Sequence, residues 1–206
     1  MSSPPRPSSI DAVASAVDPE SLDLTERSSP DGAVTLLFSD IEGSTAIMER
    51  IGERRSFEVL RDHTSLVRQL VESFGGSVVK SQGDGFMVSF PSAHAGVHCA
   101  IEMQRTFDGH SVPDVGPLKV RIGLHSGYVI ADADDFFGRN VVLAARIADR
   151  AGGGEILVSS TVKDYTETDP RVEFEARGEF HLKGLVGEHT IYAVRWFDGG
   201  ATPDPA

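Results

Sequence analysis

The sequence predicts one α+β domain with a ferredoxin-like split βαβ core and additional C-terminal strands. Three observations support this prediction. Short apolar runs typical of strands alternate with segments of helical spacing along most of the chain. Their order is β-α-β-β-α-β, with the first connection long enough for two helices, as in the split βαβ motif. Further helices and strands follow, and this mixed order favours a sheet with helices on one face.

The first half of the core is predicted from four segments. The continuous apolar run Ala33–Phe38 is typical of a strand that is buried on both faces. Glu53–Phe74 has apolar residues at helical spacing, and this helix is expected to end at the two glycines that follow it. Ser77–Ser81 and Phe86–Phe90 are typical of two strands joined by a tight turn.

The second half begins at Pro91, which predicts the start of a helix that reaches about Phe107. Leu118–His125 alternates between apolar and polar residues and predicts a strand. Arg139–Arg150 has helical spacing and is followed by three glycines. The remaining expected elements are strand segments at Tyr128–Ala131, Glu155–Ser159, Val172–Leu182 and Thr190–Trp196, and a short helix at Thr161–Thr166.

The domain is expected to span residues 32–197 of the 206-residue chain. Residues 1–31 are rich in Ser, Pro and acidic groups, so they bury too little apolar surface to offset their ordering entropy. They are predicted to be a disordered N-terminal tail, and residues 198–206 a second short disordered tail.

Charge and composition limit the partners and the compartment. The formal net charge of -12 argues against nucleic acid or an anionic membrane surface as the main partner. No segment approaches the ~18 apolar residues of a membrane span, and the N-terminus lacks the apolar core of a signal peptide. Cys99 is the only cysteine, so no intrachain disulfide forms, and we expect a cytoplasmic protein.

Two aspartates are the first candidate site residues. Asp40 follows the first predicted strand, and Asp84 lies in the tight turn of the hairpin. Taken singly, Asp40 is compatible with a helix cap and Asp84 with ordinary turn chemistry. In a split βαβ sheet, however, the first strand lies beside the central hairpin, so the two carboxylates are expected to be close. Adjacent carboxylates repel unless a cation lies between them, and Mg²⁺ prefers one or two carboxylates plus phosphate oxygens.

Six segments in order then resemble the motifs of class III adenylyl and guanylyl cyclase catalytic domains, over roughly Val34 to Val194. The six segments are Phe38–Gly43, Lys80–Asp84, Arg121–Gly127, Asp135–Gly138, Ala144–Arg146 and Leu182–Gly184. Taken singly, Lys80, Asp135 and Arg146 are compatible with solvated or ion-paired surface residues. The full set in this order favours the class III cyclase fold and its chemistry.

The resemblance implies a metal site and a base-reading pair. Asp40 and Asp84, with the backbone carbonyl of Ile41, would hold two Mg²⁺ or Mn²⁺ ions. Lys80 and Asp135 would bind the edge of adenine. Guanylyl cyclases of this family typically have Glu at the lysine position and a small residue at the aspartate position, so this chain has the adenylyl pair.

The resemblance also implies roles for two further cations and a quaternary structure. Arg146 would stabilise charge on the α-phosphate, and Lys183 would hold the terminal phosphates. In this family, the metal aspartates come from one chain, and the other four residues come from its partner. The resemblance thus implies a homodimeric adenylyl cyclase that converts ATP to cyclic AMP and pyrophosphate.

Two features depart from the family pattern. Val142 stands where the family usually has an Asn, four residues before the catalytic Arg. Asn140 is two positions away and is expected to point elsewhere on the helix, whereas Arg139 shares the face of Arg146. The stretch from Gly127 to Asp135 is also shorter than in many members, which predicts a smaller dimerisation arm.

These departures keep one alternative open: a weakly active or inactive nucleotide-binding regulatory module that uses the same pocket. The pair of metal aspartates argues against it, because a module that only binds needs no such pair. A diguanylate cyclase is disfavoured, since the Gly-Gly-Asp/Glu-Glu-Phe motif is absent from the sequence.

Overall fold

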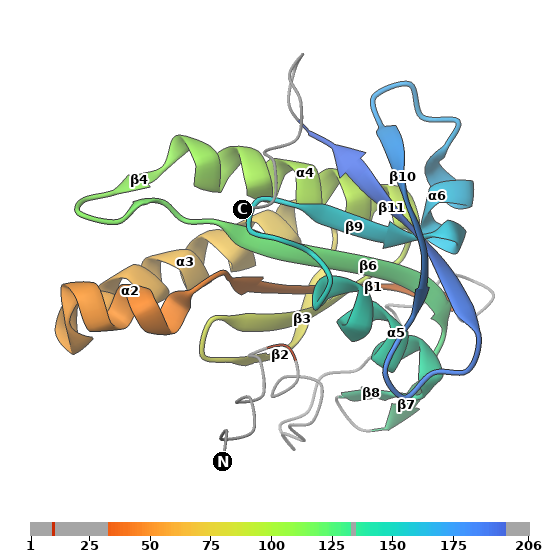
Figure 1. Ribbon diagram of the computed structural model, residues 1–206, viewed down its shortest axis with the longest axis horizontal. Coiled ribbons are helices and arrows are strands. Elements are labelled where there is room, and N and C mark those ends of the chain that lie inside the picture. Colours follow the sequence, from red (N-terminus) through yellow and green to blue (C-terminus); the bar gives the residue numbers. More distant parts are fainter. Residues whose placement is uncertain (1–9, 11–32, 133–134, 197–206) are drawn as a thin grey trace.

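A seven-stranded sheet forms the centre of the molecule in a computed structural model that describes residues 10, 33–132 and 135–196 (Figure 1). The strand order is β10-β11-β9-β6-β1-β3-β2. Strands β6 and β9 are parallel, and the other neighbouring strands of this sheet are antiparallel. The strands are β1 Ala33–Ile41, β2 Ser77–Gln82, β3 Gly85–Phe90, β6 Val120–Tyr128, β9 Ile156–Ser159, β10 Glu173–His181 and β11 Glu188–Arg195.

Five helices and two small hairpins complete the described part of the chain. The helices are α2 Ser44–Ile51, α3 Glu53–Ser73, α4 Ala93–Gly109, α5 Arg139–Ala148 and α6 Ser160–Thr166. One hairpin pairs β4 Ser111–Val112 with β5 Gly116–Pro117, and the other pairs β7 Ile130–Asp132 with β8 Asp135–Phe137. The predicted α+β fold is confirmed, because β1, the α2–α3 connection, the β2–β3 hairpin, α4 and β6 form the split βαβ core.

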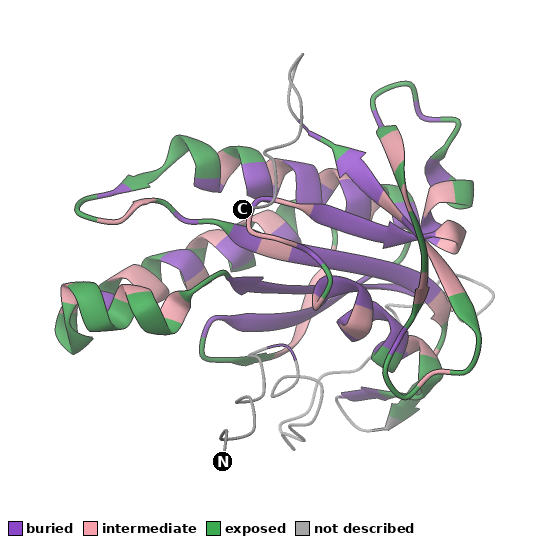
Figure 2. Cartoon of the chain, viewed as in Figure 1, coloured by how far each residue is buried: buried purple, intermediate pink, exposed green. Residues whose placement is uncertain are grey.

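Helices α3 and α4 cover one face of the sheet. The side chains of Leu37 on β1, Phe86 on β3 and Val97 on α4 belong to the largest buried apolar cluster. Figure 2 shows this buried layer along β1, β3 and β6. Helix α4 begins two residues later than Pro91 suggests, because the Ser92 Oγ accepts a hydrogen bond from the Ala95 backbone N–H (3.2 Å) and caps the helix there.

Helix α5 lies on the opposite face, so the expectation of helices on one face only was wrong. Its residues Val141 and Ala144 belong to a second cluster with Leu36 and Phe38, whose side chains alternate along β1 with those of the first cluster. The helix approaches very closely, because Gly123 on β6 has no side chain. A Cβ at this position would come within 2.2 Å of the Ala148 backbone nitrogen. Small residues on both elements therefore explain why α5 fits directly against the sheet.

The ends of the chain lie mostly outside the described residues. The predicted tails, 1–31 and 198–206, fall there except for Ile10, whose side chain is fully buried in the second cluster with Phe38 and Met87. Among the helices that the structure describes, none has the length and apolar character needed to cross a membrane.

Candidate active site

Asp40 and Asp84 are buried, with 1% and 5% relative exposure, and the charge of Asp84 acts on the Asp40 carboxylate. Asp40 lies near the end of β1, and Asp84 lies in the turn that joins β2 to β3, where Gly83 adopts a φ of 63°. The Oδ2 atom of Asp84 accepts a hydrogen bond from the backbone N–H of Ile41 (3.0 Å). Because β1 pairs with β3, the hairpin turn folds back against the residue that follows Asp40.

Arg121 is a functional candidate that the sequence analysis missed. It lies directly opposite Asp40 in the β1–β6 register. Its Nε donates to Asp40 Oδ1 (2.8 Å), and its Nη2 donates to Asp40 Oδ2, which makes the pair bidentate. Arg121 could have been singled out in the sequence, because it is the one charged residue in the strand segment from Val120 to Leu124.

Burial and neighbouring charges act in opposite directions on Asp40. Burial raises the pKa of Asp40, because it penalises the ionised carboxylate, and the Arg121 guanidinium opposes that increase. The carboxylates of Asp84 and Asp149 raise the pKa of Asp40 further. Asp40 therefore occupies a site where additional positive charge is favoured.

Lys80 and Asp135 form a buried ion pair on the same face of the sheet as Asp40. Their Nζ–Oδ2 distance is 2.5 Å, and their side chains have 8% and 5% relative exposure. Lys80 comes from β2 and Asp135 from the start of β8, 55 residues later. The other carboxylate oxygen of Asp135 accepts from the backbone N–H of Phe136 (2.7 Å), which fixes the orientation of the carboxylate. The structure thus brings these two predicted site residues together.

Helix α5 carries Arg146 near its C-terminal end. The Nη1 atom of Arg146 lies 2.7 Å from Oδ2 of Asp149, and Asp149 also acts electrostatically on Asp40 and Arg121. Arg146 is therefore linked to the aspartate pair through a carboxylate that the sequence analysis did not identify.

Lys183 is exposed in the turn between β10 and β11. Leu182 and Leu185 of this turn share a buried cluster with Leu143 of α5, so the turn packs against the helix. Arg139 adds a hydrogen bond from its Nη2 to the Val186 backbone oxygen (3.1 Å).

Asn140 is held by the sheet. Its Oδ1 atom lies 3.1 Å from His125 Nε2, and its Nδ2 donates to the Tyr128 backbone oxygen (2.7 Å). The other ring nitrogen of His125 lies 2.8 Å from Ser159 Oγ, and burial lowers the pKa of His125. A neutral imidazole with its proton on Nε2 satisfies these contacts. Asn140 thus fastens the start of α5 to β6 and does not share the face of Val142.

Comparisons with known proteins agree with this geometry. The family model described as the adenylate and guanylate cyclase catalytic domain matches residues 26–195. An adenylate cyclase of Mycosarcoma maydis is 35% identical over 162 residues, which cover 66% of this chain and 6% of that protein. The chain spans less than half the length of the first curated relatives that it matches.

Solved structures of both cyclase types are similar. A structure of adenylate cyclases from Trypanosoma brucei in their monomeric state has a TM-score of 0.74 and 25% identity, covering 82% of this chain and 91% of that chain. The guanylate cyclase domain of RhGC from Catenaria anguillulae, in complex with GTP, has a TM-score of 0.70 and 21% identity, covering 80% and 96%. At 21% identity, this second likeness concerns the fold only.

Proposed function

The chain belongs to the family of adenylate and guanylate cyclase catalytic domains, and we propose that it is an adenylyl cyclase, converting ATP to 3′,5′-cyclic AMP and pyrophosphate. The observation that carries this proposal is the buried Lys80–Asp135 pair. It places a hydrogen-bond donor beside an acceptor, which complements the edge of adenine.

The base is distinguished by the position of one exocyclic group. In the proposed complex, Lys80 donates to a ring nitrogen of adenine, and Asp135 accepts from the exocyclic amine. Guanine has a carbonyl where adenine has that amine, so two acceptors would face each other, at a cost of about 1–3 kcal/mol. This corresponds to a preference for adenine of roughly 5- to 150-fold.

The residues around Asp40 fit a pair of divalent cations. The donors are two buried carboxylates and the backbone carbonyl of Ile41, which are oxygen ligands of the kind that Mg²⁺ and Mn²⁺ prefer. No group of three or more His, Cys, Asp or Glu side chains suited to a metal ion occurs in the described part of the chain. The remaining ligands would therefore be backbone, water and phosphate oxygens. Bound ions would lower the pKa of the ribose 3′-hydroxyl and neutralise charge on the triphosphate.

The protein groups have separate tasks in this reaction. The 3′-hydroxyl gives its proton to solvent, its oxygen forms a bond to the α-phosphorus, and the bond from the α-phosphorus to the bridging oxygen breaks, so that pyrophosphate leaves. Arg146 stabilises the negative charge that develops at the α-phosphate, and Lys183 holds the terminal phosphates. Arg121 orients the Asp40 carboxylate through its two hydrogen bonds.

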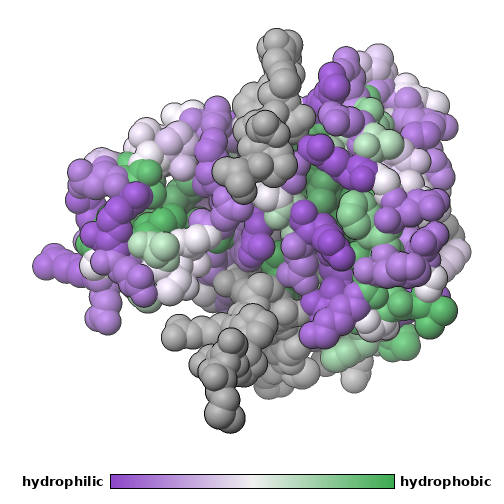
Figure 3. All heavy atoms as spheres, viewed as in Figure 1, coloured by the Kyte–Doolittle hydropathy of each residue, from purple (hydrophilic) through white to green (hydrophobic). Residues whose placement is uncertain are grey.

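A homodimer supplies both halves of each site in this proposal. Asp40 and Asp84 come from one protomer, while Lys80, Asp135, Arg146 and Lys183 come from its partner. Exposed apolar side chains support an interface on this side of the molecule. The end of β6, the β7–β8 hairpin and the β10–β11 turn carry several of them, and apolar surface is visible at the lower right of Figure 3. They are Tyr128, Ile130, Phe137 and Val186.

Val142 favours a second candidate function, a weakly active or inactive nucleotide-binding regulatory module. Its side chain retains 38% relative exposure beside Arg139 and the β10–β11 turn. An apolar side chain at this position has no hydrogen bond to offer a sugar. Such a module would bind the nucleotide without converting it efficiently.

The test is incubation of the purified chain with ATP or GTP in separate reactions, each with Mg²⁺ or Mn²⁺, followed by detection of cyclic nucleotide and pyrophosphate. We expect cyclic AMP from ATP and much less cyclic GMP from GTP. Nucleotide binding in calorimetry without any cyclic product would favour the regulatory module. Cyclic GMP as the main product would contradict the assigned base preference.

A further inference from the structure

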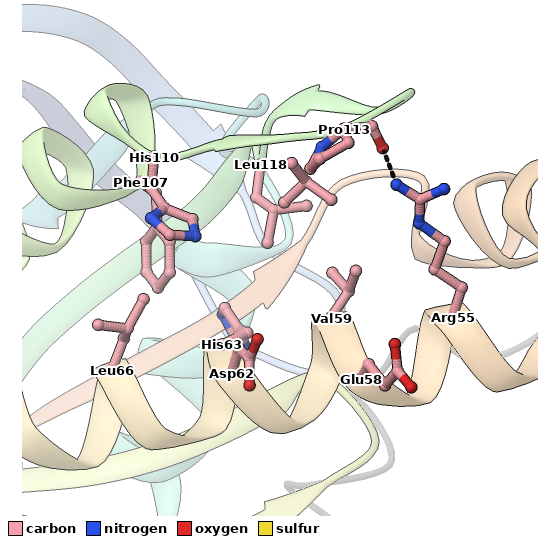
Figure 4. A pocket seen from close by; sticks show the side chains of 11 residues that line it. Arg55, Glu58, Val59, Asp62, His63, Leu66, Phe107, His110, Pro113 and Leu118 are labelled. Atoms are coloured by element: carbon pink, nitrogen blue, oxygen red, sulfur yellow. Dashed lines mark hydrogen bonds between the residues drawn. The ribbon is translucent and has the colours of Figure 1, made fainter.

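A pocket lies on the face of the sheet that is opposite to the Lys80–Asp135 pair. It is bounded by α3, the end of α4 and the β4–β5 hairpin, and its volume is about 190 Å³ (Figure 4). Its walls include Val59 and Leu66 from α3, Phe107 from α4 and Leu118. An apolar cavity of about 150 Å³ holds one benzene molecule, so this pocket has room for a single aromatic ring with a small substituent.

His63 is the most buried polar side chain of this lining, which also includes the exposed His110 and three charged residues at the rim. It is 1% exposed, and neither of its ring nitrogens has a hydrogen-bond partner among the residues that the structure describes. Its ring lies 4.9 Å from the Phe107 ring and 5.7 Å from the Phe86 ring, measured between centroids. In Figure 4 it projects from α3 toward Phe107. A buried polar group without a partner is costly, and native proteins satisfy most such groups.

The imidazole of His63 is neutral near pH 7. Burial lowers the pKa of His63 to about 4, although the charge of Asp84 acts in the opposite direction. A neutral imidazole offers one N–H donor and one nitrogen acceptor. A ligand that reaches His63 can therefore gain a hydrogen bond with a hydroxyl, amide or indole group.

The charged groups at the rim already have partners. The Arg55 guanidinium lies 2.8 Å from an Asp114 carboxylate oxygen and donates to the Pro113 backbone oxygen (3.1 Å). The carboxylates of Glu58 and Asp62 lie 3.9 Å and 3.5 Å from neighbouring arginines of α3. The rim carries a guanidinium group and two carboxylates, and each is paired with a neighbouring charge. The rim therefore does not favour a charged ligand.

We propose that this pocket binds a small, uncharged aromatic molecule carrying one hydrogen-bonding group, and that His63 is the polar contact at its base. The volume limits the ligand to a single ring, and the aromatic and aliphatic side chains of the walls favour an apolar ring. His63 favours a ligand that carries one hydrogen-bonding group. The pocket and the Asp40 carboxylate are on opposite faces of the sheet, because Phe86 and His63 lie on the α3–α4 face and Asp40 on the α5 face, although Asp84 is near enough for its charge to act on His63.

The test uses phenol and toluene as probes, because they have the same ring and differ by the hydroxyl group. Binding to the full chain is measured by ligand-detected NMR and by the ¹⁵N signals of the histidine rings, without nucleotide or metal. We expect phenol to bind about tenfold more tightly than toluene, which is the gain from one buried hydrogen bond, and to shift the signal of His63. Probe binding is measured without cyclase activity, so a failure of the pocket proposal is distinguishable from a failure of the proposed function.

Three variants locate the binding site. His63→Phe should remove the preference for phenol, and Leu66→Trp should abolish binding of both probes by filling the pocket. His94→Phe makes the same chemical change at an exposed position of α4 and should leave binding unchanged. Equal affinities of phenol and toluene for the unmodified chain would overturn the proposal, as would undiminished binding to folded Leu66→Trp.

Discussion

Replacing Val142 with asparagine is expected to raise the kcat for ATP cyclisation by roughly 10- to 100-fold. Val142 lies on α5, one turn before Arg146, and lines a pocket of about 270 Å³ together with Arg139 and the β10–β11 turn. Asn140 cannot supply the missing amide, because His125 and the Tyr128 backbone already hold both ends of its side chain. In the proposed complex, residue 142 would therefore contact the sugar only through apolar atoms.

The magnitude follows from one hydrogen bond to the reacting sugar. Such a bond contributes about 1–3 kcal/mol when the group would otherwise be unpaired, and each 1.36 kcal/mol changes the rate tenfold. Orientation of the 3′-oxygen toward the α-phosphorus governs this rate, because attack requires near-attack geometry. The cost to stability is moderate, because Val142 is 38% exposed and its replacement loses about 1–2 kcal/mol of apolar burial. Valine and asparagine have similar helix propensities.

The measurement is steady-state kinetics with ATP, alongside circular dichroism and analytical ultracentrifugation to verify folding and dimerisation. Val142→Leu is the matched control, because leucine has nearly the shape of asparagine without the amide, and it should show no gain. A kcat for folded, dimeric Val142→Asn that is equal to or below that of the parent would refute the reasoning. It would mean that residue 142 does not limit turnover, and that Arg139 or an ordered water already orients the sugar.

Three further experiments test the remaining parts of the proposed site. Asp84→Ala should abolish turnover while the melting temperature stays within a few degrees of the parent, and retention of most activity would contradict the two-metal site. Mixing inactive Asp40→Ala with inactive Arg146→Ala should restore part of the activity, because one of the two hybrid sites is intact. No recovery under conditions of demonstrated subunit exchange would exclude a shared site. Combining Lys80→Glu with Asp135→Ala should lower kcat/KM for ATP and permit some GTP turnover, and an unchanged preference would show that the pair does not read the base.

The sequence was sufficient to predict the helices and strands that are marked by a pattern of neighbouring residues. The apolar run at Ala33–Phe38 corresponds to β1, which extends to Ile41, and the helix expected over Glu53–Phe74 is α3, Glu53–Ser73. This helix ends where expected, because Gly75 adopts a φ of 68° and lets the chain turn away. Such boundaries depend on spacing, capping and glycine, which are properties of neighbouring residues. The short strands β4, β5, β7 and β8 carry too few residues to show a period, and none of the four was predicted as a strand with these bounds.

Features that depend on register and distant contacts were beyond the sequence alone. The bidentate Arg121–Asp40 pair exists because these residues lie opposite each other across 81 positions of sequence. Similarly, the position of α5 on the second face depends on the close approach of Gly123 to Ala148. The adjacency of Asp40 and Asp84, in contrast, was expected, because the split βαβ topology itself places the first strand beside the hairpin.

The formal charges around Asp40 give an independent reason for a metal-dependent reaction. On the protomer that would supply the metal ligands, Asp40 and Asp84 contribute two carboxylates and Arg121 contributes one guanidinium group, so these three residues have a formal charge of -1. A triphosphate carries several negative charges, and a cluster of this sign repels it. Cations that arrive with the nucleotide would reverse the sign and bridge the carboxylates to the phosphates. Arg121 is already paired with Asp40, so it is poorly suited to balancing a triphosphate without bound cations.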